Sequence, residues 1–197
     1  MISTFSFPSE LNDPQNYYYY EKGFSDDELN KIYKDVATLD FVQASTIDAA
    51  SVNKQIRSSS VKWVPKTQQW VWLYEKLMNM AIEANNTLWK FNLYTILDDI
   101  QYTEYYASED GHYTWHQDFG PGKPSLRKVS ITVQLSGPDE YEGGDLEYWQ
   151  GGYSITKAPK DKGVVFIFPS YMMHRVTPVT KGTRRSFVLW VGGEHYK

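Results

Sequence analysis

Residues 163–193, GVVFIFPSYMMHRVTPVTKGTRRSFVLWVGG, contain two strongly apolar runs separated by a polar turn. The first run, GVVFIFP, and the last, RRSFVLWVG, are rich in Val, Phe and Leu and lie next to Gly and Pro, which is typical of β-strands. Runs of the same kind recur from residue 89 onward between Gly, Pro and Asp turns. This pattern indicates an antiparallel sandwich or barrel of about eight short strands. The other runs are KFNLYTI (90–96), IQYTEYY (100–106), RKVSITVQL (127–135), GDLEYWQ (144–150) and YSITKA (153–158).

The pattern before residue 89 is different. Residues 17–24 predict a strand that runs into a turn. The following SDDE matches a capping box at the start of an amphipathic helix over 26–38. A second helix is expected over roughly 67–86. The polar residues 43–60 between the two helices predict a loop or an irregular strand.

These elements predict a mainly β fold with packed helices. We expect a jelly-roll in which the N-terminal α-helices lie on one sheet. No internal repeat or linker divides the chain, so a single domain is expected over 1–197. Within it, residues 1–90 would form a helical support region and residues 91–193 the barrel.

Composition restricts the classes of protein to which the chain can belong. Hydrophobic residues make up 41% and aromatic residues 16% of the 197 positions, which is typical of a globular protein with a packed core. The net charge of −4 and the lack of a dense basic patch argue against a nucleic-acid partner. No stretch approaches the ~20 apolar residues of a membrane span, and no secretory signal is visible. We therefore expect a soluble, cytoplasmic protein without a membrane partner.

The absence of cysteine leaves His, Asp and Glu as the side chains that could hold a metal. His116 and Asp118 stand two residues apart, and in an extended strand such side chains point to the same face. His174 follows the strand GVVFIFP at a position where a sheet presents side chains to a cavity. Two imidazoles and one carboxylate with open positions form the facial triad of non-heme Fe(II) oxygenases. For the 116/118 pair alone, a surface His beside a surface Asp remains the alternative.

The last apolar run carries an arginine on its inward face. In a strand over 184–191, Arg184, Ser186, Val188 and Trp190 share one side, and the two apolar members place that side in the interior. A buried guanidinium is costly unless it meets an anion, and its planar fork fits a carboxylate. Ser186 could add a hydrogen bond to the same group. The alternatives are a salt bridge to an internal acid or an Arg184 that reaches solvent.

Together these motifs resemble the Fe(II)- and 2-oxoglutarate-dependent dioxygenases. The similarity is greatest to the prolyl 4-hydroxylase-like branch, which includes the bacterial PKHD-type hydroxylases. It covers about residues 95–193, and the segment GFSDDELNKI (23–32) is also similar to the entry helix of that branch. The motifs that carry it are HQD (116–118), His174, PVTKGTRRS (178–186), RKVSITVQLS (127–136) and YEGGDLEYW (141–149).

The resemblance implies a double-stranded β-helix, a cupin-like jelly-roll with Fe(II) at its mouth. It implies 2-oxoglutarate and O2 as cosubstrates, succinate and CO2 as coproducts, and ascorbate as a further candidate cofactor. By position, His116, Asp118 and His174 would hold the iron, and Arg184 the distal carboxylate of 2-oxoglutarate. Tyr106 falls near the cosubstrate in this scheme, with sheet packing as the alternative. Gln134 stands where some relatives have a cosubstrate-binding tyrosine, which leaves those contacts open.

The resemblance favours a prolyl residue in a peptide or protein as the substrate, hydroxylated at C4. Another amino-acid side chain or a free amino acid is the alternative. Arg57 and Trp63, beside the polar 43–60 segment, are candidate substrate contacts. Two alternative functions are compatible with the same barrel fold but involve no oxygenase activity. One is a cupin-like metal protein with non-oxidative chemistry, and the other is a jelly-roll module that binds a sugar or peptide.

Overall fold

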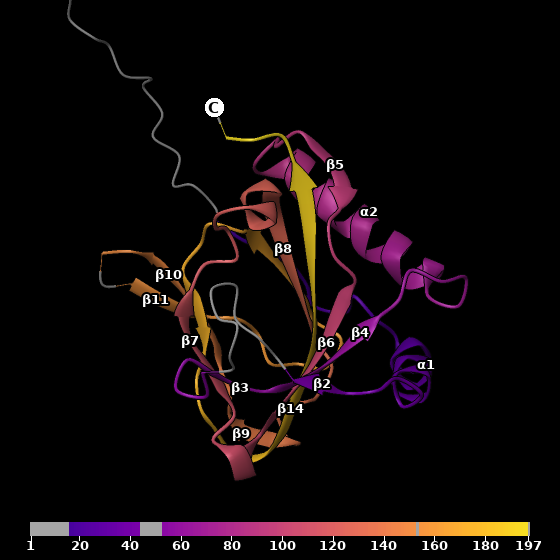
Figure 1. Cartoon of the computed structure of the whole chain (residues 1–197), viewed down its shortest axis with the longest axis vertical. Helices are drawn as coiled ribbons and strands as arrows, with labels where there is room; N and C mark the ends of the chain where they lie inside the picture. The colour runs from indigo at the N-terminus through magenta and orange to yellow at the C-terminus, as the bar shows by residue number, and fades with distance from the viewer. Residues whose placement is uncertain (1–15, 44–52, 153, 197) are drawn as a thin grey trace, which may run out of the picture.

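The computed structural model describes residues 16–43, 53–152 and 154–196, which form two antiparallel sheets and two α-helices (Figure 1). Within the described residues, the larger sheet has nine strands, with the order β1-β12-β8-β14-β6-β4-β2 and with β5 and β9 also paired to β14. The smaller sheet has the order β11-β10-β13-β7-β3. The predicted mainly β jelly-roll is therefore confirmed.

The bounds of these elements follow the sequence pattern closely after residue 89. The helices are α1 (Asp26–Val36), α2 (Val71–Thr87) and the short 3-10 helices η1 (Ala107–Glu109) and η2 (Lys123–Leu126). The strands are β1 (Tyr18–Tyr20), β2 (Val42–Gln43), β3 (Arg57–Ser58), β4 (Ser60–Val64), β5 (Leu93–Ile96), β6 (Ile100–Tyr106), β7 (His112–His116), β8 (Arg127–Gln134), β9 (Tyr141–Gly143), β10 (Leu146–Gly151), β11 (Ser154–Lys157), β12 (Val165–Pro169), β13 (His174–Val176) and β14 (Val179–Gly193).

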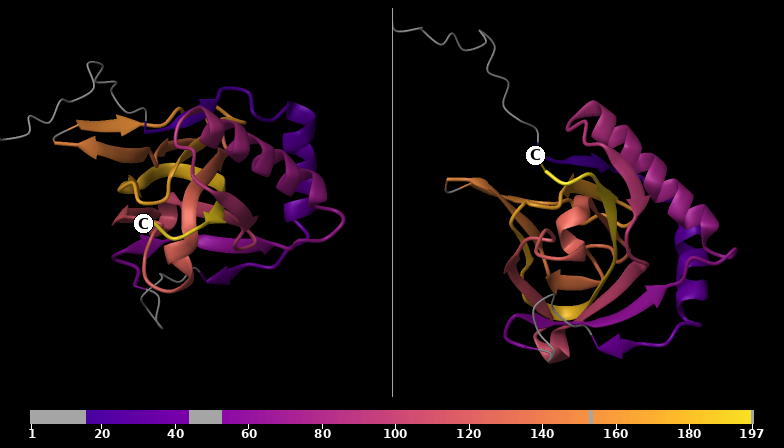
Figure 2. Two further views of the ribbon diagram at one scale, coloured as in Figure 1. Left: turned by 90° about the horizontal axis from the view of Figure 1, so that it is seen from above. Right: turned by 45° about the horizontal axis from the view of Figure 1, so that its top comes forward.

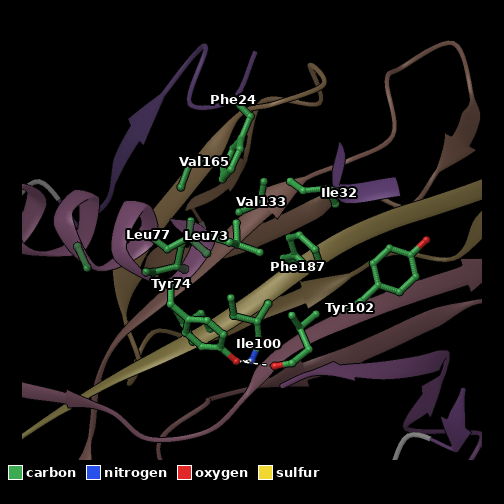
Figure 3. Packing of buried hydrophobic residues seen from close by; sticks show 14 of the residues in the cluster. Phe24, Ile32, Leu73, Tyr74, Leu77, Ile100, Tyr102, Val133, Val165 and Phe187 are labelled. Atoms are coloured by element: carbon green, nitrogen blue, oxygen red, sulfur yellow. Dashed lines mark hydrogen bonds between the residues drawn. The ribbon is translucent and has the colours of Figure 1, made fainter. Parts of the chain in front are cut away.

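Both helices cover the outer face of the larger sheet and lie together on one side of the molecule (Figure 2). Ile32 of α1 and Leu73 and Leu77 of α2 are fully buried against this sheet, in a core that includes Val133 and Phe187 (Figure 3). Each such side chain contributes roughly 1.5–3 kcal/mol through its burial. This core therefore fixes the sheet whose other face lines the site. In the described part of the chain, no helix is long and apolar enough to cross a membrane.

Strand β8 is buried on both faces, and its residues alternate in character. Val129, Ile131 and Val133 belong to the helix-covered core. The residues between them, Ser130, Thr132 and Gln134, are buried polar side chains on the opposite face. A polar side chain is tolerated there only with hydrogen-bond partners, so this face is organised by polar contacts.

The N-terminal part differs from the expected helical support region. The capping box at Ser25 is present, with the Glu28 amide donating to the Ser25 hydroxyl and the Ser25 amide donating to the Glu28 carboxylate. The second helix begins at residue 71, because residues 67–70 form a turn ahead of it. Residues 57–64 form strands β3 and β4, which join different sheets. This region therefore adds strands to both sheets, and residues 44–52 of the expected loop lie outside the described residues.

The same alternation gives β6 a charged cluster on its helix-side face. The Tyr102 hydroxyl donates to Glu104 Oε1 at 2.6 Å, the Tyr106 hydroxyl also donates to this carboxylate, and Arg185 Nε donates to it at 3.1 Å. Burial alone would raise the pKa of Glu104, but the two tyrosine hydrogen bonds and the Arg185 charge outweigh it and lower this pKa. The ionised carboxylate is therefore the form that stabilises the fold.

We predict that Glu104→Gln lowers the free energy of unfolding at neutral pH by about 1–3 kcal/mol, since a charge-assisted cluster is broken. The folded pKa lies below the unfolded value of about 4.3, so this stabilisation is complete above that value and is lost as the pH falls through the folded pKa. Urea unfolding at neutral and acidic pH measures it. Glu142→Gln, on an exposed carboxylate, is the control, with a change under about 0.5 kcal/mol. A gap between wild type and Glu104→Gln that persists in acid would contradict this account.

Candidate active site

The three predicted metal ligands meet at one point between the sheets. His116 ends β7 and His174 begins β13, and the two are direct partners in the ladder. Asp118 lies two residues beyond β7, where its amide donates to the Ser170 carbonyl at 3.0 Å. One ligand atom from each of the three residues lies within 4.8 Å of the other two, and in the described part of the chain they are the one such group of three. Metal–ligand bonds of about 2.0–2.2 Å allow one ion to bridge this spacing.

Hydrogen bonds orient both imidazoles toward that point. His116 Nδ1 lies 2.8 Å from the Thr114 carbonyl, and His174 Nδ1 lies 2.9 Å from the Met172 carbonyl. A carbonyl accepts, so each Nδ1 carries the proton and each Nε2 keeps its lone pair. The Nε2 atoms lie 3.8 Å and 3.7 Å from the two Asp118 oxygens. Burial, followed by the nearby His174, lowers the pKa of His116, which keeps its ring neutral and ready to bind a cation.

The Asp118 carboxylate is ionised although it is buried. Burial would raise its pKa, but His174, His116 and a 2.6 Å hydrogen bond from the Ser130 hydroxyl together lower it. Ser130 is in turn 2.9 Å from the Ser170 hydroxyl. Ser130 was not predicted from the sequence. The signal that could have found it is its place on the polar face of an alternating strand, level with Thr132 and Gln134.

A cavity of about 300 Å³ opens beside these three residues. Its wall includes Arg184, Ser186, Val188 and Trp190, the four residues predicted to share the inner face of the last strand. Ser186 pairs with Gln134 and Trp190 with Ser130 across β14 and β8, so the ladder sets the spacing of this wall. The predicted inward face of 184–190 is therefore confirmed.

Arg184 is 2% exposed and has no carboxylate partner among the described residues. Its Nη1 donates to the Ser186 hydroxyl at 3.2 Å and its Nη2 to Gln134 Oε1 at 3.1 Å, while Nε has no partner. Neutral acceptors compensate a buried charge poorly. The guanidinium is therefore positioned to bind an anion in the cavity.

Gln134 lies behind Arg184 and does not line this cavity. Its Nε2 donates to the Tyr141 hydroxyl at 2.9 Å and to the Ser136 carbonyl at 3.0 Å, which fixes its oxygen toward Arg184. Gly144 makes room beside them, because an added Cβ would lie 3.1 Å from Arg184 Cδ, at a φ of +58° that favours glycine.

Tyr106 lies on the opposite face of β6 from the cavity, where its hydroxyl donates to Glu104. The tyrosine of this strand that lines the cavity is Tyr105, whose ring faces the Arg184 guanidinium at 5.5 Å. One residue along a strand reverses the direction of the side chain. Tyr105 therefore lines the cavity, and Tyr106 packs in the sheet cluster, which is the alternative expected for it.

Arg57 and Trp63 both line the cavity, although they come from different sheets. Arg57 is 6% exposed on β3, whereas Trp63 on β4 is 41% exposed. Arg127 and Tyr113, which were not predicted from the sequence, line it as well. Arg127 packs 3.8 Å from the Trp190 ring centre and donates to Asp98 and to the Asp118 carbonyl.

We predict that Ser130→Ala weakens metal affinity by roughly 10-fold or more, because the supporting hydrogen bond orients the Asp118 carboxylate. Anaerobic titration with Mn(II), followed by calorimetry, measures the change independently of turnover. Ser154→Ala, at an exposed serine of β11, is the matched control. Equal affinity for Mn(II) in Ser130→Ala and in the control would refute the orienting role.

Comparison with known proteins agrees with this geometry. Residues 100–192 match the model of the 2OG-Fe(II) oxygenase superfamily. A PKHD-type hydroxylase of Teredinibacter turnerae is 38% identical over 86 residues, which cover 41% of this chain and 38% of that protein. One of Alteromonas mediterranea is 37% identical over 90 residues, covering 43% and 39%. The chain thus spans about two fifths of the length of these curated relatives.

Solved structures share the fold across most of the chain. A prolyl hydroxylase from Trichoplax adhaerens, in complex with a hypoxia inducible factor peptide fragment, superimposes with a TM-score of 0.76 at 17% identity. That match covers 90% of this chain and 84% of the other. A prolyl-4-hydroxylase from Pseudomonas putida gives a TM-score of 0.67 at 18% identity, covering 91% and 93%. Residues 100–192 are therefore similar to the 2OG-Fe(II) oxygenase superfamily in sequence and contain its His-Asp-His group, and the solved structures show that the chain shares their fold.

Proposed function

We propose that this protein is a non-heme Fe(II)- and 2-oxoglutarate-dependent dioxygenase that hydroxylates a C–H bond of an amino-acid residue. The observation that carries the proposal is the buried Arg184 guanidinium without a carboxylate partner among the described residues, in the cavity that holds the three metal ligands. A metal site alone fits many chemistries. A metal site with a second cation in the same cavity fits a ligand that carries two anionic ends.

The ligand set fits Fe(II). His116, Asp118 and His174 provide two neutral nitrogens and one anionic oxygen, and both imidazoles are held in the tautomer that leaves Nε2 free. When bound, the iron supplies oxygen activation, with 2-oxoglutarate oxidised to succinate and CO2 and one oxygen atom passed to the substrate C–H bond. The chain's own task is to position both ligands and exclude water.

The cosubstrate fits the wall beside Arg184. The guanidinium would bind the distal carboxylate through the nitrogen edges that now contact Ser186 and Gln134. Ser186 would contribute its hydroxyl to the same group. Gln134 and Tyr141 act as positioning residues, because they hold the guanidinium in place without reaching the cavity's centre. Burial strengthens these charge-assisted contacts.

The substrate that we propose is a prolyl residue in a peptide or protein. The prolyl hydroxylases among the structural neighbours support this substrate, and the name of the PKHD-type relatives supports a hydroxylation. Trp63 at the rim and Trp190 in the wall offer apolar ring surfaces of the kind that pack on a pyrrolidine ring. Another amino-acid side chain or a free amino acid fits the same chemistry and is an outcome of the test below.

The test begins with anaerobic addition of Fe(II) and 2-oxoglutarate, which is expected to produce a weak visible charge-transfer band. Admission of air should then give succinate. Arg184→Gln should raise the KM for 2-oxoglutarate roughly 30-fold or more, because the distal carboxylate would lose the guanidinium charge that pairs with it. Lys181→Gln removes an exposed positive charge nearby in the chain and should leave this KM unchanged.

Folded, metal-loaded protein that gives neither the band nor succinate would refute the dioxygenase. Wild-type protein that binds the metal but does not respond to 2-oxoglutarate, with metal binding unchanged in Arg184→Gln, would instead identify a metal protein of another chemistry. Binding of sugars or peptides that survives loss of all three ligands would identify a binding module.

A further inference from the structure

Arg57 is a second buried guanidinium in the cavity, and its surroundings differ from those of a structural arginine. It lies on β3, paired with Tyr113 of β7 in the ladder. Its Nε donates to the Ser59 hydroxyl at 2.8 Å, and its terminal nitrogens make no hydrogen bond to any described residue. The residue is 6% exposed, and it lines the cavity. Within the described part of the chain, these nitrogens therefore have hydrogen-bonding capacity left for a ligand.

Arg57 differs from most other arginines of the chain in its lack of a carboxylate partner among the described residues. The sequence holds five arginines, and all five are described. Arg127, Arg175 and Arg185 each pair with a carboxylate, at 2.9 Å, 2.7 Å and 3.1 Å respectively. Arg57 and Arg184 have no such partner among the described residues, and both line the same cavity. Considering residues 16–43, 53–152 and 154–196, two guanidinium groups without a carboxylate partner thus line one cavity.

Arg57 is also close to the metal ligands through one aromatic ring. Its guanidinium lies 4.9 Å from the Tyr113 ring centre, and the Tyr113 ring stacks on His116 with centres 3.5 Å apart and planes 16° apart. A ligand bound to Arg57 would therefore lie near the reacting centre, at the side of the cavity formed by the smaller sheet. This side is separate from the β14 wall that carries Arg184.

The charges of the cavity indicate what that ligand carries. Three arginines line the cavity with one carboxylate, Asp118. Arg127 is paired with Asp98, Arg184 takes one end of the cosubstrate in the proposed function, and the metal takes the other end. One positive charge then remains, on Arg57. A buried guanidinium left without a counter-charge is costly, so the missing anion arrives with the primary substrate.

We infer that Arg57 is a specificity-determining residue that binds a carboxylate of the primary substrate. This inference rests on the proposed function and narrows its substrate class to molecules with a carboxylate near the hydroxylated carbon. Two sources share this chemistry. One is an Asp or Glu side chain next to the target residue in a peptide, and the other is the α-carboxylate of a free amino acid or a chain end.

Matched substrate pairs test the inference on the wild-type protein. The peptide pair is a blocked prolyl peptide with Asp beside the proline and the same peptide with Asn. The free pair is L-proline and L-prolinamide. Affinities are measured anaerobically by calorimetry on protein loaded with Mn(II) and 2-oxoglutarate, so that binding is read without turnover. We expect the carboxylate member of one pair to bind roughly 30-fold or more tightly than its amide, and the pair that responds identifies the source.

Variants then assign the preference to this side chain. Arg57→Gln should abolish the discrimination between carboxylate and amide. Arg57→Lys should retain part of it, because the charge remains while the planar fork is lost. Lys181→Gln, which removes an exposed charge, should retain all of it. The affinity for 2-oxoglutarate should stay within about twofold of wild type in Arg57→Gln.

Equal binding within both pairs, or no binding of any member, would overturn the inference. A 2-oxoglutarate affinity that falls in Arg57→Gln while substrate discrimination is unchanged would also overturn it, since Arg57 would then serve the cosubstrate. Succinate formed by wild-type protein from 2-oxoglutarate in air, without any peptide, reports separately on the proposed dioxygenase. Its absence identifies failure of the proposed function rather than of the role of Arg57.

Discussion

The site depends on the antiparallel pairing of β7 with β13, which places His116 directly opposite His174. This pairing brings two distant segments of the chain into one ladder and holds both imidazoles rigidly. Asp118 then needs only a two-residue extension, fixed by its amide on the Ser170 carbonyl. The metal site is therefore a product of sheet register. A shift of one residue in this register would turn one imidazole to the other face of the sheet, and the three metal ligands would no longer meet.

Much of this arrangement was accessible from the sequence because it follows from alternation. The i, i+2 spacing of His116 and Asp118 and the inward face of 184–190 both follow from the two-residue period of a strand. The order of the strands and the meeting of His174 with His116 did not follow from local pattern alone. They depended on a resemblance to a known fold, since long-range pairing leaves little local trace.

Two details of the prediction were resolved by the structure for identifiable physical reasons. Residues 43–60 were expected as a loop or an irregular strand because they are polar, and within this range residues 57–58 form β3, which places Arg57 as a buried polar side chain in the cavity wall. A strand whose inward side chains serve a polar cavity lacks the apolar signature of a core strand. Tyr106 was expected either near the cosubstrate or as a tyrosine that packs in the sheet. Its hydroxyl donates to Glu104 on the helix-side face, which fits the second alternative, while Tyr105 lines the cavity.

Strand β14 has a consequence for how variants of this protein behave. Its even-numbered residues from Arg184 to Trp190 line the cavity, while the odd-numbered Phe187, Leu189 and Val191 lie in the helix-covered core. The same strand therefore lines the cavity with one face and packs in the hydrophobic core with the other. A truncated core side chain at Phe187 or Leu189 would disturb the anchor of its immediate neighbours. Substitutions at these apolar positions would then lower catalytic rates, even though their side chains lie on the face of the strand that is turned away from the cavity.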